Sequence, residues 1–349
     1  MPSLPLEVLK LIVEFLDPHD LASALHAIPG IASILSSEYL HLQINDRRET
    51  VFHLLARTGN EVSIKLFLVK KSIPLDVKDE RGLSPLSWAA KCGHAGIVRL
   101  LIGCSDVESK CLHGWTPLSL AARMGHESVV SALLSCESVD PDSRDRWNCT
   151  PLYYAAGNGH LGIVELLLEK GANPVMSDSR GWTPLARAAQ EGLADIVKLL
   201  IQHSRLATDR ADFEGRTPLS HAAEEGHYEV VQLLLAQEDV NVDSRDADGR
   251  TPLAWAARGG HAEVVKVLLD RGDVEADSKC NFYWTPLSRA SQEGHEKVVK
   301  LLVARCEVNV HVQDDQGHTP LDHASAGGHR GVQKLLLARI QTDASSSQA

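Results

Sequence analysis

Histidines that follow a glycine at a regular interval are the residues of this sequence best suited to chemistry. They are His94, His126, His160, His227, His261, His295 and His329. Imidazole nitrogens bind transition metals and transfer protons near neutral pH. The interval argues against a shared metal, because helices stacked at ordinary distances would hold these residues roughly 10 Å apart. Zinc needs each ligand at about 2.0–2.1 Å. We therefore expect structural histidines and no metal site.

Aspartate is the second residue that recurs at one position of a repeating pattern. The members of this series are Asp79, Asp145, Asp178, Asp212, Asp246 and Asp314. A carboxylate that precedes a turn accepts hydrogen bonds from nearby backbone N–H groups, so we expect turn residues and not a catalytic pair. The sequence also lacks GxSxG, HExxH and GxxxxGK[ST] motifs. These observations predict a protein that is not an enzyme and needs no cofactor.

The elements that must position these residues are copies of one unit, which is clearest at 246–279. Each copy contains a TPL-like triplet, and consecutive triplets begin 32 to 34 residues apart. The triplets begin at Thr50, Ser84, Thr116, Thr150, Thr183, Thr217, Thr251, Thr285 and Thr319. A pattern that keeps its phase over nine copies indicates a repeat protein, in which each unit packs on its neighbours.

The unit at 246–279 predicts two helices and a turn. Gly249 suits a turn with positive φ, Thr251 can cap a helix, and Pro252 can occupy its first position. Gly260 can end that helix in the left-handed conformation. A second helix carries a wide apolar face over 264–269. One unit cannot bury this face alone, so the copies must stack.

The period, the TPL triplet, the Ala-Ala pair and the Gly-His pair resemble the ankyrin repeat over residues 46–340. The resemblance implies an all-α solenoid of helix-turn-helix units with short β-hairpin turns. The repeats are expected near 45–78, 79–110, 111–144, 145–177, 178–211, 212–245, 246–279, 280–313 and 314–340. Tyr283 replaces the turn glycine of one copy, so an irregular turn is expected there. The polar residues 341–349 are expected to form a cap followed by disorder.

Residues 1–45 lack the repeat pattern and predict three short helices. Helical apolar spacing begins after Leu4-Pro5 and ends at Asp17-Pro18, and Pro29-Gly30 marks a further break. Three helices in so short a segment make too small a core to be robust alone. We expect this module to lean on the repeats, on a partner, or on both.

The stretch LPLEVLKLIVEFLDPHDL at the start of this segment resembles an F-box, the module that docks substrate receptors on the adaptor of a cullin-type ubiquitin ligase. The resemblance is good from Leu4 to Leu21, weakens beyond Leu25, and lacks the tryptophan of the third helix. Carried over by position, the adaptor-binding residues are Leu4, Pro5, Leu9, Ile12, Leu16 and Leu21. The alternative is that the helices only cap the first repeat.

A binding surface is expected where the copies differ, on the turns and the inner face of the first helices. Tryptophan and arginine are enriched at binding hot spots and gather at these positions. The predicted partner groove consists of Trp115, Trp147, Trp182, Arg216, Arg250, Arg258, Phe282 and Trp284. The alternative is that each tryptophan packs on the neighbouring turn and is partly buried. Trp88 and Trp255, inside first helices, are interpreted as packing residues.

Composition and charge restrict the partners. The net charge of −11 and pI of about 5.8 argue against a nucleic-acid binder, which needs a basic stripe. Seven cysteines without a CxxC pair indicate free thiols in a reducing compartment. The chain shows no secretory signal and no apolar run of the ~20 residues that cross a membrane. We expect a monomer of the cytoplasm or nucleus with no membrane partner.

Together these features predict a protein–protein interaction module. The resemblance implies a substrate receptor of a cullin-type ubiquitin ligase, with the F-box holding the adaptor and the groove holding the target protein. The combination is similar to the F-box–ankyrin proteins of filamentous fungi. The alternative function is an interaction scaffold with no role in ubiquitination, whose N-terminal helices serve as a cap.

Overall fold

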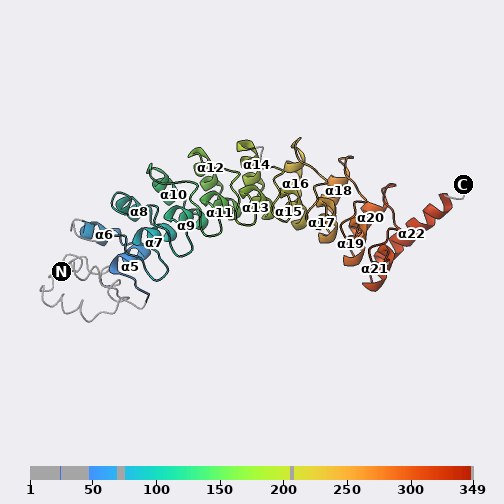
Figure 1. The fold of residues 1–349 in the computed structure, drawn as a ribbon, viewed down its shortest axis with the longest axis horizontal. Coiled ribbons are helices and arrows are strands. Elements are labelled where there is room, and N and C mark those ends of the chain that lie inside the picture. The colour runs from blue at the N-terminus through green and yellow to red at the C-terminus, as the bar shows by residue number, and fades with distance from the viewer. Residues whose placement is uncertain (1–23, 25–46, 69–74, 205–207, 347–349) are drawn as a thin grey trace. The chain divides into compact units, whose positions relative to one another are not determined.

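The computed structural model describes residues 24, 47–68, 75–204 and 208–346, and all the regular structure outside residue 24 consists of helices α5 to α22 (Figure 1). The chain divides into two compact units, 1–173 and 174–349, and each is described by itself. The expected all-α class is confirmed for the described residues. The F-box-like segment apart from residue 24, with all six of its predicted adaptor-binding residues, lies outside the described residues.

The described part of the N-terminal unit contains four helix pairs. Their bounds are α5 (Val51–Thr58), α6 (Glu61–Leu68), α7 (Pro85–Cys92), α8 (Ala95–Leu101), α9 (Pro117–Met124), α10 (Glu127–Leu134), α11 (Pro151–Gly157) and α12 (Leu161–Glu169). First helices pack on first helices in the order α5, α7, α9, α11, and second helices pack in the order α6, α8, α10, α12. The unit is therefore two parallel rows, as expected for stacked repeats.

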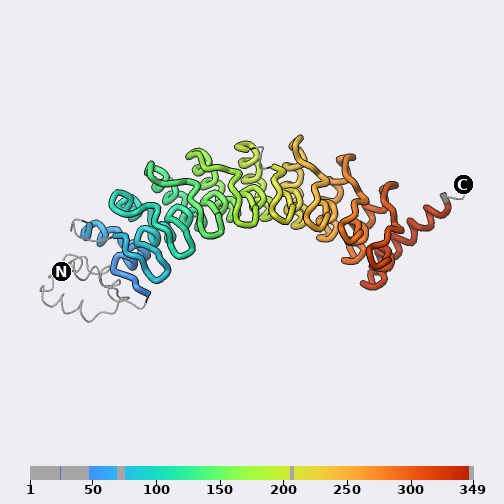
Figure 2. The backbone as a smooth tube through the Cα atoms, viewed as in Figure 1, coloured from blue at the N-terminus to red at the C-terminus, as the bar shows by residue number. Residues whose placement is uncertain are grey.

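Five helix pairs form the same two rows in the residues of the C-terminal unit that the structure describes. Their bounds are α13 (Pro184–Gln190), α14 (Ala194–His203), α15 (Pro218–Glu225), α16 (Tyr228–Leu235), α17 (Pro252–Gly259), α18 (Ala262–Leu269), α19 (Pro286–Glu293), α20 (Glu296–Val303), α21 (Pro320–Ala326) and α22 (Arg330–Ser346). Within each unit the backbone repeats one path of turn, helix, loop and helix (Figure 2).

Local chemistry sets the start of each first helix. The Thr251 side chain accepts a hydrogen bond from the Ala254 N–H, and Pro252 stands in the first turn. Gly260 ends the helix with φ of 76°. A glycine stands at this position in all nine copies, with φ between 71° and 82° in each, which explains why no other residue type occurs there. They are Gly59, Gly93, Gly125, Gly159, Gly192, Gly226, Gly260, Gly294 and Gly328.

The core lies between the two rows. In the repeat at 212–245 it includes Leu219 of α15 and Val231 and Leu234 of α16, each with 0% of its surface exposed. The small Ala222 and Ala223 are also fully buried, and they let neighbouring first helices approach closely. The apolar face predicted for the second helices is thus the face that packs.

The turns differ from the expected β-hairpins. No strand occurs among the residues that the structure describes. Within each unit, neighbouring turns are instead joined by a single backbone bond, such as that from the Leu112 N–H to the Arg81 carbonyl at 2.9 Å. One bond per turn does not make a ladder, so the hairpins are turns only.

Two further expectations were wrong. The turn at Tyr283 is regular, because Tyr283 itself adopts φ of 62° and its N–H bonds the Cys280 carbonyl at 2.9 Å. The polar tail is helical as far as Ser346, as part of α22. Arg339 holds this extension, since its Nε donates to Asp343 at 2.9 Å and its guanidinium reaches the Arg305 carbonyl at 3.2 Å.

Candidate partner-binding surface

The seven Gly-His histidines each link their own repeat to the one before it. All seven place Nε2 at 2.8–3.2 Å from a backbone carbonyl of the preceding repeat, as His261 does with Glu224 at 2.8 Å. The ring also covers a glycine of that repeat, because a Cβ on Gly226 would lie 2.3 Å from His261 Nδ1. Each histidine therefore has a structural role, and the seven rings do not converge on one site.

The turn aspartates act as predicted through one oxygen. Asp246 Oδ1 accepts the N–H groups of Asp248 at 3.0 Å and Arg250 at 2.8 Å, and five other repeats show the same pair of bonds. All six aspartates of the series are buried. The second oxygen of a buried carboxylate also needs a hydrogen-bond partner. The residue type of that partner sets the chemistry of the surface formed by the turns and the first helices.

In five of the six, the second oxygen is reached by a side chain nine residues later, on the first helix. Trp88 Nε1 donates to Asp79 Oδ2 at 2.9 Å, and Trp255 Nε1 donates to Asp246 Oδ2 at 3.1 Å. His221 and His323 occupy this position opposite Asp212 and Asp314, and Tyr154 donates to Asp145. Sequence reasoning missed these bonds, although the spacing of nine from an aspartate to an aromatic side chain was visible.

In the N-terminal unit the predicted Trp115 and Trp147 lie near each other. The half-buried Trp115 donates from Nε1 to Asp145 Oδ2 at 2.9 Å and to Tyr154 Oη at 3.0 Å. Burial raises the pKa of Tyr154, and its bond to Asp145 raises it further, so its hydroxyl remains a donor. Trp147 is 45% exposed and stacks on His113 with ring centroids 5.6 Å apart. Trp147 therefore offers the larger free aromatic surface.

In the C-terminal unit Trp182 and Trp284 cover the histidines of the following repeats. The Trp182 ring centroid lies 4.0 Å from that of His221, and the Trp284 centroid lies 4.2 Å from that of His323. Both tryptophans are half-buried. Their geometry matches the packing that was considered as the alternative, while their remaining surface is open to a partner.

The predicted arginines surround one tryptophan. The guanidinium carbons of Arg216, Arg250 and Arg258 lie 4.4, 4.2 and 5.5 Å from the Trp255 ring centroid. Arg216 pairs with Glu224, and Arg250 donates to Asp246 at 2.9 Å. Exposed Arg258 has no ion pair among the described residues. The arginines therefore form a cationic surface around an indole, where Arg258 is available for an anionic group.

Exposed aromatic side chains occur on the turn tips of this unit. Phe282 is 49% exposed, as a partner-binding residue would require, and Tyr283 beside it is 56% exposed. Phe213 is 78% exposed and was not among the predicted residues. The sequence feature that could have identified Phe213 is its position at a turn, directly after Asp212. Large exposed apolar side chains on one edge are typical of an interaction surface.

The buried pair His221 and Asp212 makes stability depend on pH. Burial lowers the pKa of His221, and nearby Arg216 lowers it further. Burial alone would raise the pKa of Asp212, but bonds from His221 and from the Arg216 and Glu214 N–H groups outweigh it and lower the pKa. Both folded-state pKa values therefore lie below the unfolded ones. Each group contributes stability above its unfolded pKa and loses it as the pH falls.

We expect the free energy of unfolding to decrease as the pH falls below about 6.5, by up to roughly 1.4 kcal/mol per pH unit from His221. His221→Gln keeps an amide donor near Asp212 but removes the titration, so its slope should be shallower. Denaturant unfolding at pH 7 and 5 measures this difference. The burial-lowered pKa of His53 leaves a residual slope in the variant. Equal slopes for both proteins would contradict the assignment.

Comparison with known proteins supports the repeat architecture. A family model of ankyrin repeats in three copies matches in overlapping segments from 30–111 to 273–346. No F-box model matches the N-terminal segment, and the first ankyrin match already begins at residue 30. No described helix is both long enough and apolar enough to span a membrane.

Several curated proteins share part of this sequence. Ankyrin repeat and KH domain-containing protein mask-1 of Caenorhabditis elegans is 37% identical over 40% of this chain. Alpha-latrotoxin-Lt1a of Latrodectus tredecimguttatus is 32% identical over 36% of it. The human transient receptor potential cation channel subfamily A member 1 is 38% identical over 20% of it. The aligned segments span only 5%, 9% and 6% of these proteins.

These matches concern the repeats and not the activities of the whole relatives. Ankyrin repeats generally serve as non-enzymatic scaffolds that bind other proteins. The matched segments together run from residue 30 to residue 346, which is most of the chain. The matched repeat is also the unit of the structure. Stacked helix pairs, capped first helices and Gly-His links recur with it along the chain. The chain belongs to the ankyrin-repeat family and is a protein–protein interaction module.

Proposed function

We propose that this chain is a substrate receptor of a cullin-type ubiquitin ligase, acting in the cytoplasm or nucleus. The N-terminal segment docks the ligase adaptor, and the inner surface of the repeats holds the target protein. The observation that carries the proposal is the LPLEVLKLIVEFLDPHDL stretch directly before an ankyrin array. The repeats contribute binding and positioning, while ubiquitin transfer belongs to other subunits.

The target-binding part is supported by the surface around Trp255. Cation–π contacts hold three arginines there, and the unpaired Arg258 can bind a carboxylate of the target without breaking an internal ion pair. The exposed Phe282 supplies apolar contact area in the same unit. Aromatic and arginine side chains that become buried when a partner binds carry most of the binding free energy of many protein interfaces.

The alternative function is an ankyrin scaffold without a role in ubiquitination. Two observations favour it. No F-box model matches residues 1–45, and the ankyrin match begins at residue 30, inside that segment. In this alternative the N-terminal helices cap the first repeat, and the repeats bind their partner as proposed above.

Co-purification of the full chain with the ligase adaptor separates the two functions. We expect wild-type protein to retain the adaptor, and a variant with Leu4, Pro5 and Leu16 replaced by alanine to lose it. The variant must keep the wild-type circular dichroism, because loss of the repeats would also abolish retention. If folded wild-type protein retains no adaptor, the scaffold function replaces the receptor.

Affinity for the captured target tests the groove. Arg258→Ala and Trp182→Ala should each weaken binding by more than about 1 kcal/mol, the level that marks a hot spot. Arg250 is unsuitable, because its removal would leave the buried Asp246 without its ion pair. Lys198→Ala is the matched control, since Lys198 is exposed on the second-helix row. Unchanged affinity in both folded groove variants would place the target elsewhere.

A further inference from the structure

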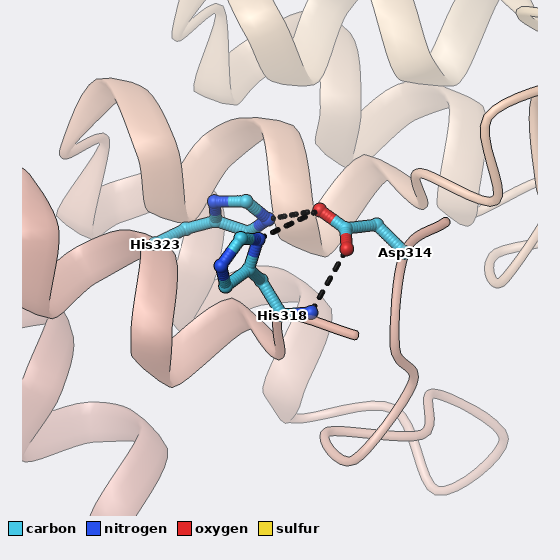
Figure 3. A group of neighbouring side chains, drawn as sticks. All are labelled: Asp314, His318 and His323. Atoms are coloured by element: carbon cyan, nitrogen blue, oxygen red, sulfur yellow. Dashed lines mark hydrogen bonds and ion pairs between the residues drawn. The ribbon is translucent and has the colours of Figure 1, made fainter. Parts of the chain in front are cut away.

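Three potential metal ligands lie together in the last repeat. Asp314 precedes the turn, His318 follows it, and His323 projects from α21 toward the same carboxylate (Figure 3). One ligand atom from each residue lies within 4.8 Å of the other two. No other group of three or more metal-ligating side chains this close occurs among the described residues.

The fold itself requires only part of this cluster. Asp314 Oδ1 accepts the N–H groups of Gln316 and His318 at 2.9 Å each, and Oδ2 lies 2.9 Å from His323 Nε2. The repeat at 212–245 makes the same bonds with Asp212 and His221, but Arg216 stands where His318 would be. The imidazole of His318 is therefore an addition that the turn does not need.

The His318 imidazole lies on the solvent side of this pair and has a nitrogen that makes no hydrogen bond within the described part of the chain. Its Nδ1 lies 3.7 Å from Asp314 Oδ2, which is too far for a hydrogen bond, and the ring makes no hydrogen bond among the described residues. Its side chain is 51% exposed, whereas those of His323 and Asp314 are 12% and 1% exposed. A ligand can thus reach the cluster from solvent on the His318 side.

We propose that Asp314, His318 and His323 bind a divalent transition-metal ion of the zinc class. Asp314 Oδ2, His318 Nδ1 and His323 Nε2 are the ligands, and water or a partner takes the fourth position. Tetrahedral bonds of about 2.0–2.1 Å hold two ligand atoms about 3.3 Å apart. The observed separations from Oδ2, 2.9 and 3.7 Å, lie on either side of that value. Two imidazoles and one carboxylate also suit zinc better than calcium or magnesium.

The surroundings already hold two of the three ligands in place. His323 is packed against the Trp284 ring, with centroids 4.2 Å apart and planes at 30°. Asp314 is fixed by its two backbone bonds. The ion takes the place of the proton between His323 Nε2 and Asp314 Oδ2. That proton exchanges through solvent to Nδ1 of the same ring, so that His323 binds the ion as a neutral imidazole. Binding then requires His318 to move nearer to Oδ2 and the His323–Asp314 separation to open, starting from ligand atoms that all lie within 4.8 Å of one another.

Metal titration of the chelator-treated full chain tests this site. We expect calorimetry to show one zinc bound by the wild type. His318→Arg, which recreates the residues of the 212–245 repeat, should weaken that binding by more than the roughly 10–100-fold caused by losing an outer hydrogen-bond partner of a metal ligand. His311→Gln, on an exposed residue of the preceding loop, should retain wild-type affinity.

Cobalt provides an independent readout, because its visible spectrum reports the ligand type. Nitrogen and oxygen ligands without thiolate charge-transfer bands are expected for the wild type, and the signal should be lost in His318→Arg. Thiolate bands would assign the ion to cysteines such as Cys280 or Cys306 and overturn the proposal. Absence of zinc binding by the wild type, or equal affinity in His318→Arg, would overturn it as well. The proposal does not depend on the ligase role.

Discussion

Leu234→Ala is expected to lower the free energy of unfolding by roughly 2–5 kcal/mol. Leu234 lies in α16 and has 0% of its surface exposed. The helix packs between α14 and α18, so the cavity cannot collapse without moving a neighbouring repeat. In a stacked array the loss of packing acts mainly on adjacent repeats. Amide protection should therefore decrease most in 212–245 and the repeats beside it.

Leu233→Ala is the matched control, because Leu233 has the same side chain on the same helix but is only half-buried. It should cost clearly less than Leu234→Ala. Denaturant unfolding gives the two free energies, and hydrogen exchange gives the distribution along the chain. Equal costs, or a uniform loss of protection over all described helices, would contradict the packing described for this unit.

Gly226→Ala is expected to have the second large effect. Gly226 ends α15 with φ of 79°, a conformation that costs an L-residue about 1–2 kcal/mol. A Cβ would also lie 2.3 Å from His261 Nδ1. The ring cannot move freely, because its Nε2 is bonded to the Glu224 carbonyl at 2.8 Å. Displacing it should add about 1–3 kcal/mol, as overpacking does.

Gly272→Ala separates these two contributions. Gly272 has nearly the same φ, 77°, but a Cβ there would meet no atom within 4 Å. It should therefore show only the conformational cost. The difference in unfolding free energy between the two variants measures the histidine contact. If both variants lose the same stability, the contact between the glycine and the next repeat has no energetic role.

Features set by neighbouring residues along the chain were predicted well. The cap at Thr251, the proline after it and the left-handed Gly260 each depend on a few adjacent positions. The regular interval predicted structural histidines in the Gly-His series, and these histidines bond backbone carbonyls. Local rules apply to these features because no distant residue can change the backbone requirement.

Features that depend on residues distant in the sequence could not be predicted from local sequence rules. The tyrosine at position 283 was expected to distort its turn, yet two backbone bonds hold it at positive φ, from Cys280 N–H to the Trp284 carbonyl and from Tyr283 N–H to the Cys280 carbonyl. The bond from Trp255 to Asp246 crosses from a helix to a turn, and helical periodicity does not reveal such pairs. The half-burial of Trp182 also depends on a histidine of the next repeat.

The histidine-to-carbonyl links have a consequence for how such a chain can grow or shrink over evolutionary time. Each link joins one position to an equivalent site about one unit earlier, as His295 joins the Arg258 carbonyl. A gene segment cut and rejoined at matching points therefore leaves every donor with an acceptor of the same kind. Duplication or loss of a whole unit, such as 246–279, should accordingly be tolerated where a shorter deletion would not.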